Sequence, residues 1–196
     1  MVNLIKHLEK LGIIVKYIRC DNAGEHLTFK EDSIRKGMGL TFEFTSRSTP
    51  QHNGRVERKF QTLYNKGRAM LNYAGLPTSM RKGLWAEAAN CAVLWDNASV
   101  HKQDDKPPYF KFYNKDAPYV QNMHPFGDMG TVLDPKKKIK SKLTNKGELC
   151  MMLGPAEHHT HDTCRMWNLK TRCVIITRDI RWLDISYGDY YKRSTP

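Results

Sequence analysis

Two acidic residues, Asp21 and Glu57, occur in sequence settings that suit phosphodiester chemistry. Asp21 follows the apolar run IIVKYIRC and opens the turn cluster DNAGE, whereas Glu57 lies in the basic segment STPQHNGRVERK, residues 48–59. The two acids are separated by 35 residues. Carboxylate oxygens are the ligands that Mg²⁺ and Mn²⁺ prefer. Two such ions about 4 Å apart can activate a water or a DNA 3′-hydroxyl and stabilise the leaving oxygen of a phosphodiester.

Spacing by itself favours simpler roles for these residues. An acid such as Glu57 near the start of a helix stabilises the positive end of the helix dipole. An Asp in a turn cluster commonly forms the turn, which is the ordinary role for Asp21. The cations Arg55, Arg58 and Lys59 are equally compatible with a solvated helix face.

The hydrophobic pattern predicts the elements that must position both acids. Residues 3–11 have apolar positions at helical spacing, and residues 13–20 and 40–45 read as strands. Thr28 and Glu31 form a candidate capping box for a short helix between the strands. Asp21 then lies at the carboxyl end of a strand, where ligands gather in α/β sheets.

Two helices are expected next. One opens at Asn53 or Gly54 and runs to about Tyr73, and the other covers roughly residues 84–98. We expect the following apolar residues to form their core faces: Val56, Phe60, Leu63, Ala69 and Met70 in the first, and Trp85, Ala88, Ala92 and Trp95 in the second.

Composition shifts after Ser99, where Pro and Asp cluster, and we place a domain boundary there. From residue 126 to residue 184 short apolar segments alternate with Gly, Pro and Asn. This pattern predicts a small antiparallel barrel or sandwich.

The charge balance indicates a polyanionic partner. The chain has 32 Lys and Arg against 20 Asp and Glu, a net charge of +12, and an isoelectric point near 9.5. Nucleic acid is the first expectation and an anionic membrane surface the second. A basic surface without such a partner remains the alternative.

The cysteines and the apolar runs indicate a cellular location. There are five cysteines, an odd number, and no pair has CxxC spacing, which argues for a reducing compartment. The opening MVNLIKHLEKLG has no secretory core, and no apolar run approaches membrane-spanning length. We therefore expect a soluble intracellular protein with no membrane partner.

Longer stretches closely resemble the integrase core of copia-type long-terminal-repeat retrotransposons. The segments IRCDNAGEH, TSRSTPQHNGRVERK and LPTSMRKGLWAEAANCAVLWDNAS carry the resemblance. The family pattern reads R-S-D-N-G-G-E at the second catalytic Asp and S-x-P-Y-T-P-Q-x-N-G-x-x-E-R at the catalytic Glu. This sequence keeps D-N-x-G-E and T-P-Q-x-N-G-x-x-E-R, and its 35-residue gap matches the D,D-35-E arrangement of retroviral-type integrases.

The second half of the chain extends this resemblance. The segments TNKGELCMMLG and CRMWNLKTRCVIITRDIRWLD look like the Src-homology-3-like β-barrel region that follows the core in copia-type Gag-Pol polyproteins. The resemblance thus implies an α/β fold, with a partial ribonuclease-H-like core followed by a small antiparallel β-barrel domain. The implied domains are the core at 1–99, a linker at 100–125, the barrel at 126–184 and a tail at 185–196.

The resemblance also implies roles for individual residues. Asp21 and Glu57 would be the second and third catalytic carboxylates and would hold Mg²⁺ or Mn²⁺. The expected DNA contacts come from the loop and the helix start around the Glu, and they are Gln51, Asn53, Gly54, Arg55, Arg58 and Lys59. A single acid in a basic segment then makes sense, because phosphate needs nearby cations while the metal needs a carboxylate.

The chain departs from the family pattern in one major respect. The family places its first catalytic Asp on an upstream strand, whereas the twenty residues before Asp21 contain only one acid, Glu9, on a predicted helix. We therefore expect a fragment that binds its ions weakly and is inactive alone. A smaller departure is Ala23, which stands where the family usually has Gly and disfavours a left-handed turn.

Three hypotheses on function remain at this point. The first is DNA integration, in which retrotransposon DNA ends are joined to target DNA, and it implies a nuclear site of action for a protein otherwise cytoplasmic. The second is a non-catalytic basic nucleic-acid-binding remnant of a decayed element, and the third is a structural piece without a nucleic-acid partner. The family generally works as a multimer, so a homo-oligomer is also considered, although the sequence carries no interface signature.

Two further clusters carry less weight. The stretch EHHTHDTC, residues 157–164, gathers histidines, an Asp and a Cys, but its spacing fits no familiar zinc site, and we expect an exposed polar loop. The Lys-rich stretch PKKKIKSKLTNK, residues 135–146, suits DNA phosphates, a nuclear localisation signal or a solvated loop equally.

Overall fold

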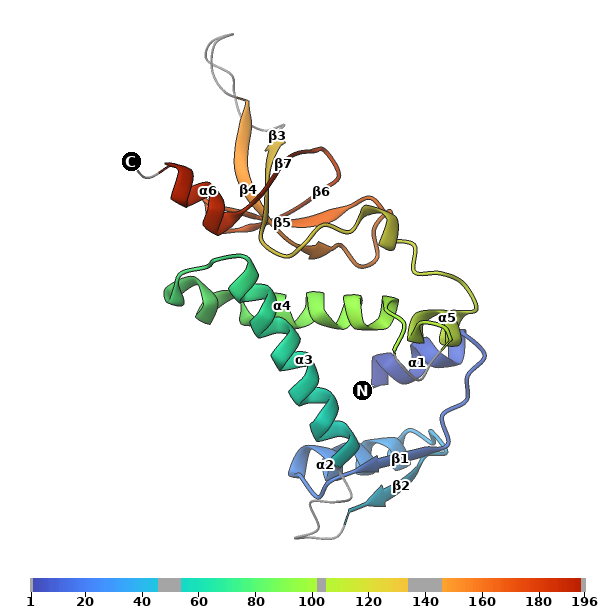
Figure 1. The fold of residues 1–196 in the computed structure, drawn as a ribbon. Helices are drawn as coiled ribbons and strands as arrows, with labels where there is room; N and C mark the ends of the chain where they lie inside the picture. The colour runs from blue at the N-terminus through green and yellow to red at the C-terminus, as the bar shows by residue number, and fades with distance from the viewer. Residues whose placement is uncertain (1, 46–53, 102–104, 134–145, 195–196) are drawn as a thin grey trace. The chain divides into compact units, whose positions relative to one another are not determined.

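The computed structural model describes residues 2–45, 54–101, 105–133 and 146–194 (Figure 1). The chain divides into two compact units, Met1–Phe60 and Gln61–Pro196. The first unit contains α1 (Val2–Lys10), α2 (Gly24–Arg35) and the strands β1 (Tyr17–Cys20) and β2 (Thr41–Phe44). The helix α3 (Gly54–Tyr73) runs through the point at which the units divide.

The first unit is built on two parallel strands joined by a helix. β1 pairs with β2 in parallel, in a register that matches Tyr17 with Thr41 and Cys20 with Phe44. α2 connects them, since parallel neighbours need a crossover. Its Phe29 packs edge-on against Phe42, with ring centroids 5.6 Å apart. Both predicted strands are therefore confirmed, although the first begins four residues later than expected.

The predicted start of the crossover helix is wrong. α2 begins at Gly24, so Thr28 lies inside it and donates a hydrogen bond from its hydroxyl to the Gly24 carbonyl, at 3.0 Å. Thr28 and Glu31 therefore do not form a capping box. The residue before the helix, Ala23, is extended with φ −62° and ψ 142°, so no left-handed turn is required of it. The turn at the end of β1 starts the helix directly.

The long helices α3 and α4 (Thr78–Ala98) confirm the two predicted helices, but their predicted core faces are only partly right. Val56 and Phe60 are 56% and 54% exposed, and α3 instead buries Gly67 and Leu71. A Cβ placed on Gly67 would lie 3.5 Å from the backbone of Ala88 in α4. At Gly67 the backbone of α3 therefore comes close to the backbone of α4. Val56 and Phe60 do not belong to this buried face.

The face predicted for α4 needs a similar correction. Ala88 and Ala92 are completely buried and Trp95 is half-buried, as expected. Trp85 is 52% exposed and lies against Tyr64 of α3, with ring centroids 6.3 Å apart. The core face of α4 thus combines the small residues Ala88, Cys91 and Ala92 with Leu84 and Leu94.

The second unit contains a five-stranded antiparallel sheet in the order β6–β5–β4–β3–β7. Its strands are β3 (Asp128–Leu133), β4 (Gly147–Pro155), β5 (Cys164–Asn168), β6 (Val174–Thr177) and β7 (Ile180–Ser186). The predicted antiparallel sheet is therefore confirmed. Closure into a barrel stays a prediction, because the described pairings leave β6 and β7 at opposite ends of this order.

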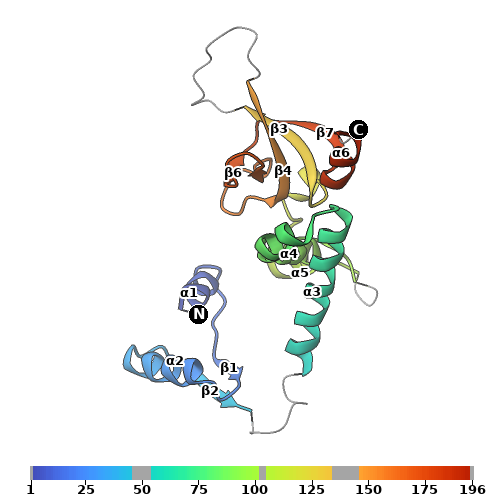
Figure 2. The ribbon, with the colours of Figure 1, turned by 90° about the vertical axis from the view of Figure 1, so that its left-hand side faces the viewer.

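The sheet and the helices of the second unit share one apolar core. Met129, Met151 and Leu153 of the sheet cluster with Leu84 and Ala88 of α4, all of them buried. Figures 1 and 2 show α4 next to the sheet. The structure groups residues 61–196 into one compact unit. The domain boundaries that composition predicts within this range stay a prediction.

Two ion pairs support this arrangement. Arg165 of β5 pairs with Glu87 of α4 at 2.6 Å. Asp96 of α4 is buried and pairs with Lys66 of α3, and His101 lies 3.8 Å from its other oxygen. A buried carboxylate without a partner would be strongly destabilising, so Asp96 fixes how α3 and α4 pack.

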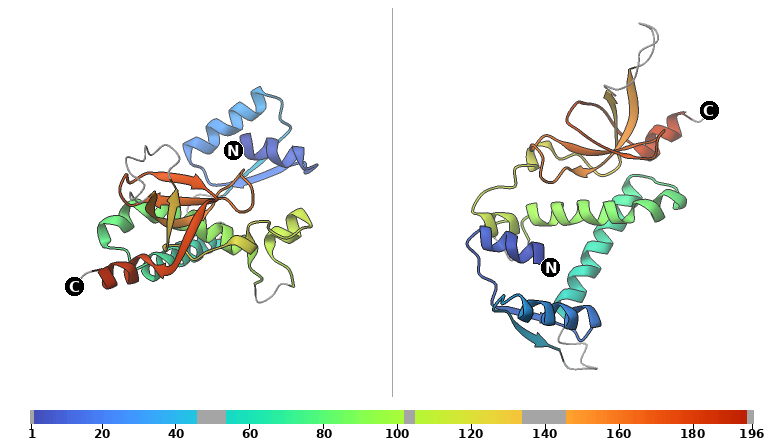
Figure 3. Two further views of the ribbon diagram at one scale, coloured as in Figure 1. Left: turned by 90° about the horizontal axis from the view of Figure 1, so that it is seen from above. Right: turned by 180° about the vertical axis from the view of Figure 1, so that it is seen from behind.

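Short helices complete the second unit. They are α5 (Pro108–Tyr113), the 3₁₀ turn η2 (Val120–Asn122) and α6 (Tyr187–Ser194), which lies within the segment predicted as a tail. α6 begins directly against the turn between α3 and α4, where the Gly188 amide donates to the Ala74 carbonyl at 2.9 Å. Figure 3 shows this neighbourhood from two further sides.

A contact between two glycines should make the α3–α4 turn intolerant of side chains. Gly75 has a φ of +63°, and a Cβ there would lie 2.7 Å from the Gly188 Cα. We expect Gly75→Ala to lower the free energy of unfolding by about 1–3 kcal/mol, because both the backbone conformation and the contact become strained. Denaturant unfolding of the purified chain measures this.

Gly83→Ala is the matched control, since a Cβ at this position in α4 meets nothing within 4 Å. It should leave stability unchanged or raise it by up to about 1 kcal/mol, because Ala favours helix. Equal midpoints for the two variants would contradict the role of the glycine contact.

A half-buried carboxyl makes stability depend on pH. Burial, and secondarily the charge of Asp184, raises the pKa of Asp128 from 3.8 to about 6. His124 stacks on Trp182 with ring centroids 3.7 Å apart, and its Nδ1 lies 4.0 Å from the Asp128 carboxylate. Burial lowers the pKa of His124.

Asp128 should therefore stabilise the fold less as pH rises. The folded state keeps the Asp128 proton at pH values where the unfolded state has lost it, so this contribution falls between about pH 4 and pH 6. We expect Asp128→Asn to raise the free energy of unfolding at pH 7 by about 1–2 kcal/mol and to have little effect at pH 4.

Denaturant unfolding at each pH, compared with wild type, isolates Asp128 from His124, which acts in the opposite direction. Asp105→Asn, at an exposed position, controls for the change in net charge. A variant that is destabilised equally at both pH values would refute this account.

Candidate active site

Asp21 lies at the carboxyl end of β1, in the turn that leads into α2. Its Oδ1 accepts a hydrogen bond from the Ala23 amide at 3.2 Å, which fixes the carboxylate to its own turn. The side chain remains 54% exposed. Burial and then the neighbouring Asp21 charge raise the pKa of the buried Cys20 thiol. An accessible carboxylate is thus held against an apolar strand end.

The turn that carries Asp21 is anchored to the end of β2. The Asn22 side-chain amide donates to the Thr45 carbonyl at 3.0 Å, and the Thr45 amide donates to the Cys20 carbonyl at 3.0 Å. These two bonds continue the parallel pairing past the strand ends. The backbone that carries Asp21 and the backbone that enters the segment after β2 therefore hold each other in place.

His26 is a neighbour of Asp21 that the sequence analysis missed. It lies in the first turn of α2, and its Nε2 is 3.3 Å from Asp21 Oδ1. When protonated, this imidazole forms an ion pair with the carboxylate. The signal in the sequence was its position five residues after Asp21, which becomes informative only once α2 is known to begin at Gly24.

Glu57 lies in the first turn of α3, where an acid interacts favourably with the helix dipole. Arg55, Arg58 and Lys59 are exposed, and their spacing of three and four residues places them on one face of this helix. The Arg58 guanidinium donates to the Gly54 carbonyl at 3.0 Å. A carboxylate and a basic face thus stand together at the start of one helix.

The other two predicted DNA-contact residues, Gln51 and Asn53, lie outside the described residues. They belong to the segment 46–53 that joins β2 to α3. The approach of the Asp21 and Glu57 carboxylates to each other therefore stays a prediction.

The donor chemistry of Asp21 and Glu57 fits a hard divalent cation, which takes oxygen ligands. Oδ2 of Asp21 takes part in neither of the contacts given above. Within the described ranges, no three His, Cys, Asp or Glu side chains gather as a ligand set. The two carboxylates thus suit part of a metal site.

The two other clusters add no functional residue. Residues 157–161 are exposed, which confirms the polar loop, whereas Cys164 is buried and burial raises its thiol pKa to about 11. Most of the Lys-rich stretch, residues 135–145, lies outside the described residues. Across the described part of the chain, the helices are all too short or too polar to cross a membrane.

Comparison with known proteins relates the chain to a retrotransposon protein. No family model matches the sequence. The chain is 30% identical over 171 residues to the Retrovirus-related Pol polyprotein from transposon TNT 1-94 of Nicotiana tabacum. The alignment covers 86% of this chain but only 12% of that polyprotein. The chain is thus related to one region of a retrotransposon Pol polyprotein, which supports a retroelement origin.

Proposed function

We propose that this chain is part of a copia-type retrotransposon integrase, which joins retroelement DNA ends to target DNA by polynucleotidyl transfer. The observation that carries the proposal is the position of Asp21 at the carboxyl end of a parallel strand pair, separated from Glu57 by 35 residues. Ligands gather at such strand ends in α/β sheets. The relationship to a retrotransposon Pol polyprotein supports the same conclusion.

In this proposal Asp21 and Glu57 hold Mg²⁺ or Mn²⁺. The bound cation supplies activation of a water or DNA 3′-hydroxyl and stabilisation of the leaving oxygen. Asn22 keeps the Asp21 turn in place through its bond to Thr45. The Ala23 amide holds Asp21 through Oδ1, and Oδ2 takes part neither in this hydrogen bond nor in the His26 contact.

The basic residues around Glu57 serve the substrate. Arg55, Arg58 and Lys59 would contact phosphates beside the scissile bond, together with Gln51, Asn53 and Gly54. Arginine suits this role because its planar guanidinium binds phosphate oxygens in pairs. Target DNA in chromosomes requires the protein to work in the nucleus, and joining two DNA ends is compatible with a homo-oligomer.

A third carboxylate is needed to complete the proposed site. The chain spans 12% of the related polyprotein. We therefore expect the complete activity to need parts of the polyprotein besides this region. With two carboxylates the cation is bound weakly, and strand transfer is expected only when a further acid is supplied by polypeptide outside residues 1–196. Asp21 and Glu57 should nevertheless contribute measurably to cation binding.

Glu57→Gln tests this contribution directly. We expect the variant to weaken Mn²⁺ binding by about tenfold or more, because a neutral amide replaces a charged oxygen ligand. Asp21→Asn should have a similar effect. Titration with Mn²⁺, followed by the electron paramagnetic resonance of the free ion, measures both affinities.

His26→Ala is the matched control at the same site. It keeps both carboxylates and removes an imidazole that contacts Asp21 Oδ1 at 3.3 Å, so Mn²⁺ should bind no more weakly than to the wild type. Unchanged affinity in Glu57→Gln and Asp21→Asn would overturn the proposed metal roles.

A second candidate function is nucleic-acid binding without catalysis. It is favoured by the net charge of +12 and by the exposed cations Arg55 and Lys59 at the start of α3. Contacts to phosphates release counterions, so the affinity of such a protein for DNA falls steeply with salt concentration. The two candidates share a DNA partner and differ in whether the carboxylates are needed.

Arg55→Gln tests the DNA contact that both candidates require. We expect weaker binding of duplex DNA, with the slope of log affinity against log salt reduced by about one unit, because one phosphate contact is lost. Fluorescence anisotropy over a series of salt concentrations measures the slope. Lys36→Gln, an exposed cation in the same unit, makes the same charge change and should leave the slope unaltered. Equal slopes in both variants would argue against a phosphate contact at Arg55.

A further inference from the structure

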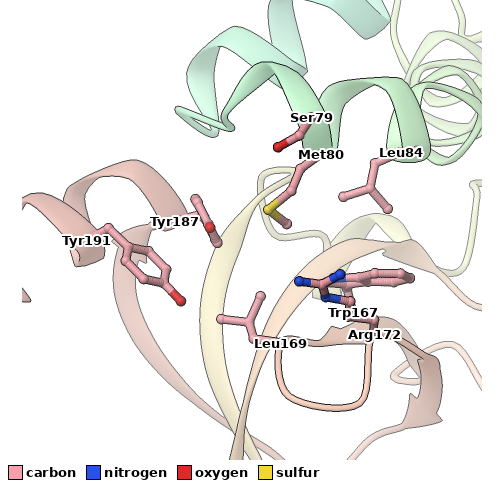
Figure 4. Close-up of a pocket in the computed structure, with 9 residues that line it drawn as sticks. Ser79, Met80, Leu84, Trp167, Leu169, Arg172, Tyr187 and Tyr191 are labelled. Atoms are coloured by element: carbon pink, nitrogen blue, oxygen red, sulfur yellow. The ribbon is translucent and has the colours of Figure 1, made fainter.

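A cavity of about 460 Å³ lies within the second unit, between α4, the β5–β6 hairpin and α6 (Figure 4). This volume falls in the range of small-molecule sites, about 300–1,000 Å³. In Figure 4, Met80 and Leu84 extend from α4 toward Leu169 and Trp167 on the hairpin, with Tyr191 at the side. The remaining lining residues are Ser79, Gly83, Arg172 and Tyr187.

The lining combines flat aromatic rings with a few polar groups. Trp167 is half-buried, and the Tyr187 and Tyr191 rings lie together with centroids 4.6 Å apart. Burial, and after it the neighbouring Tyr191, raises the pKa of Tyr187. Ser79 and Arg172 add a hydroxyl and a guanidinium. Such a surface suits a planar ligand that also carries an anionic group.

The hairpin that carries Arg172 is held in a defined conformation. Asn168 is buried, and its side-chain oxygen accepts hydrogen bonds from the amides of Lys170 and Thr171, both at 2.9 Å. Arg172 takes a left-handed conformation with φ +56°, and its amide donates to the Asn168 carbonyl at 2.9 Å. The guanidinium is thus attached to a fixed turn beside the cavity.

The opposite wall is fixed as firmly. The Tyr187 amide donates to the Gly127 carbonyl and the Gly188 amide to the Ala74 carbonyl, both at 2.9 Å. Ser186 caps the start of α6, because its hydroxyl accepts a hydrogen bond from the Asp189 amide at 3.2 Å and donates one to the Asp189 carboxylate at 2.8 Å. The cavity is therefore formed before any ligand arrives, which lowers the entropic cost of binding.

The charges around the cavity indicate the class of ligand. Arg172 is the only charged side chain among the described residues that line the cavity. Lys170 on the hairpin and Lys192 on α6 lie close to carboxylates, Glu148 at 4.0 Å and Asp189 at 3.7 Å. Arg172 disfavours a cation, such as a methylated lysine, among these aromatic rings.

We propose that this cavity binds one unpaired base of single-stranded DNA, stacked against Trp167, Tyr187 and Tyr191, with its phosphate paired to Arg172. Bases stack on aromatic side chains irrespective of sequence, and arginine binds phosphate with two donors. The inference rests on the proposed function only in taking DNA as the partner. It assigns a second DNA contact that needs neither Asp21 nor Glu57.

The full chain, tested with a labelled eight-nucleotide oligo-dT and a duplex of equal length, decides the matter. Tyr191→Leu removes a ring but keeps apolar volume, and it should weaken oligo-dT binding about fivefold or more in fluorescence anisotropy. Duplex binding should change less than about twofold, since paired bases are not available for stacking. Arg172→Gln should weaken oligo-dT binding as well.

Matched variants elsewhere in the second unit serve as controls. Tyr73→Leu removes an exposed ring from α3, and Lys115→Gln makes the same charge change as Arg172→Gln, and neither residue lines the cavity. Equal losses in the cavity and control variants would overturn the proposal, as would equal losses on oligo-dT and duplex. Tighter binding of oligo-U than of oligo-dT would overturn its assignment to DNA, and displacement of oligo-dT by a trimethyl-lysine peptide would show a protein ligand.

A crosslinking experiment on the wild type avoids any effect of mutation on folding. Oligo-dT containing 4-thiothymidine should crosslink to Trp167, Tyr187 or Tyr191, as mapped by mass spectrometry, and crosslinks confined to other residues would overturn the proposal. These outcomes are independent of Mn²⁺ binding. Failure of the cavity assignment can therefore be distinguished from failure of the proposed metal site.

Discussion

Close backbone approach at glycines is the constraint on which the second unit depends. A Cβ at Gly75 would lie 2.7 Å from the Gly188 Cα, and one at Gly127 would lie 2.2 Å from the Ala74 side chain. These contacts bring α3, α4, α6 and the sheet close enough for the methionine- and leucine-rich core to exclude water. Larger side chains at the contacts would separate the layers and leave cavities, which are costly in a packed core.

Polar contacts add direction to this packing. The buried Asp96 must face Lys66, and Arg165 must face Glu87, so the helices have one orientation on each other and on the sheet. Apolar contacts by themselves are not directional and tolerate sliding. Together the glycine contacts and the ion pairs explain why the walls of the aromatic cavity, which come from three separate elements, have fixed positions.

The first unit positions its candidate chemistry in a different way. Backbone pairing of β1 with β2 continues through Asn22 and Thr45, and this pairing presents Asp21 at the strand end with one oxygen engaged and the side chain accessible. The basic face of Arg55, Arg58 and Lys59 belongs to a helix start that also carries Glu57. The start of α3 thus carries both a carboxylate that suits a metal ion and basic side chains that suit phosphate, as a phosphodiester substrate would require.

The sequence by itself determined the local features: the strands around residues 17–20 and 41–44, the two long helices, the antiparallel second half, and Asp21 at a strand end. These follow from hydrophobic periodicity and turn residues, which act over a few positions. It did not determine which helix face is buried or that His26 meets Asp21. Only the tertiary structure decided those points. Val56, Phe60 and Trp85 have the right spacing for a core face, yet they are exposed, and burial goes to the positions that meet another element, such as Leu71 and Leu84. Likewise, the cavity residues come from α4, the β5–β6 hairpin and α6, and no local pattern can bring such distant segments together.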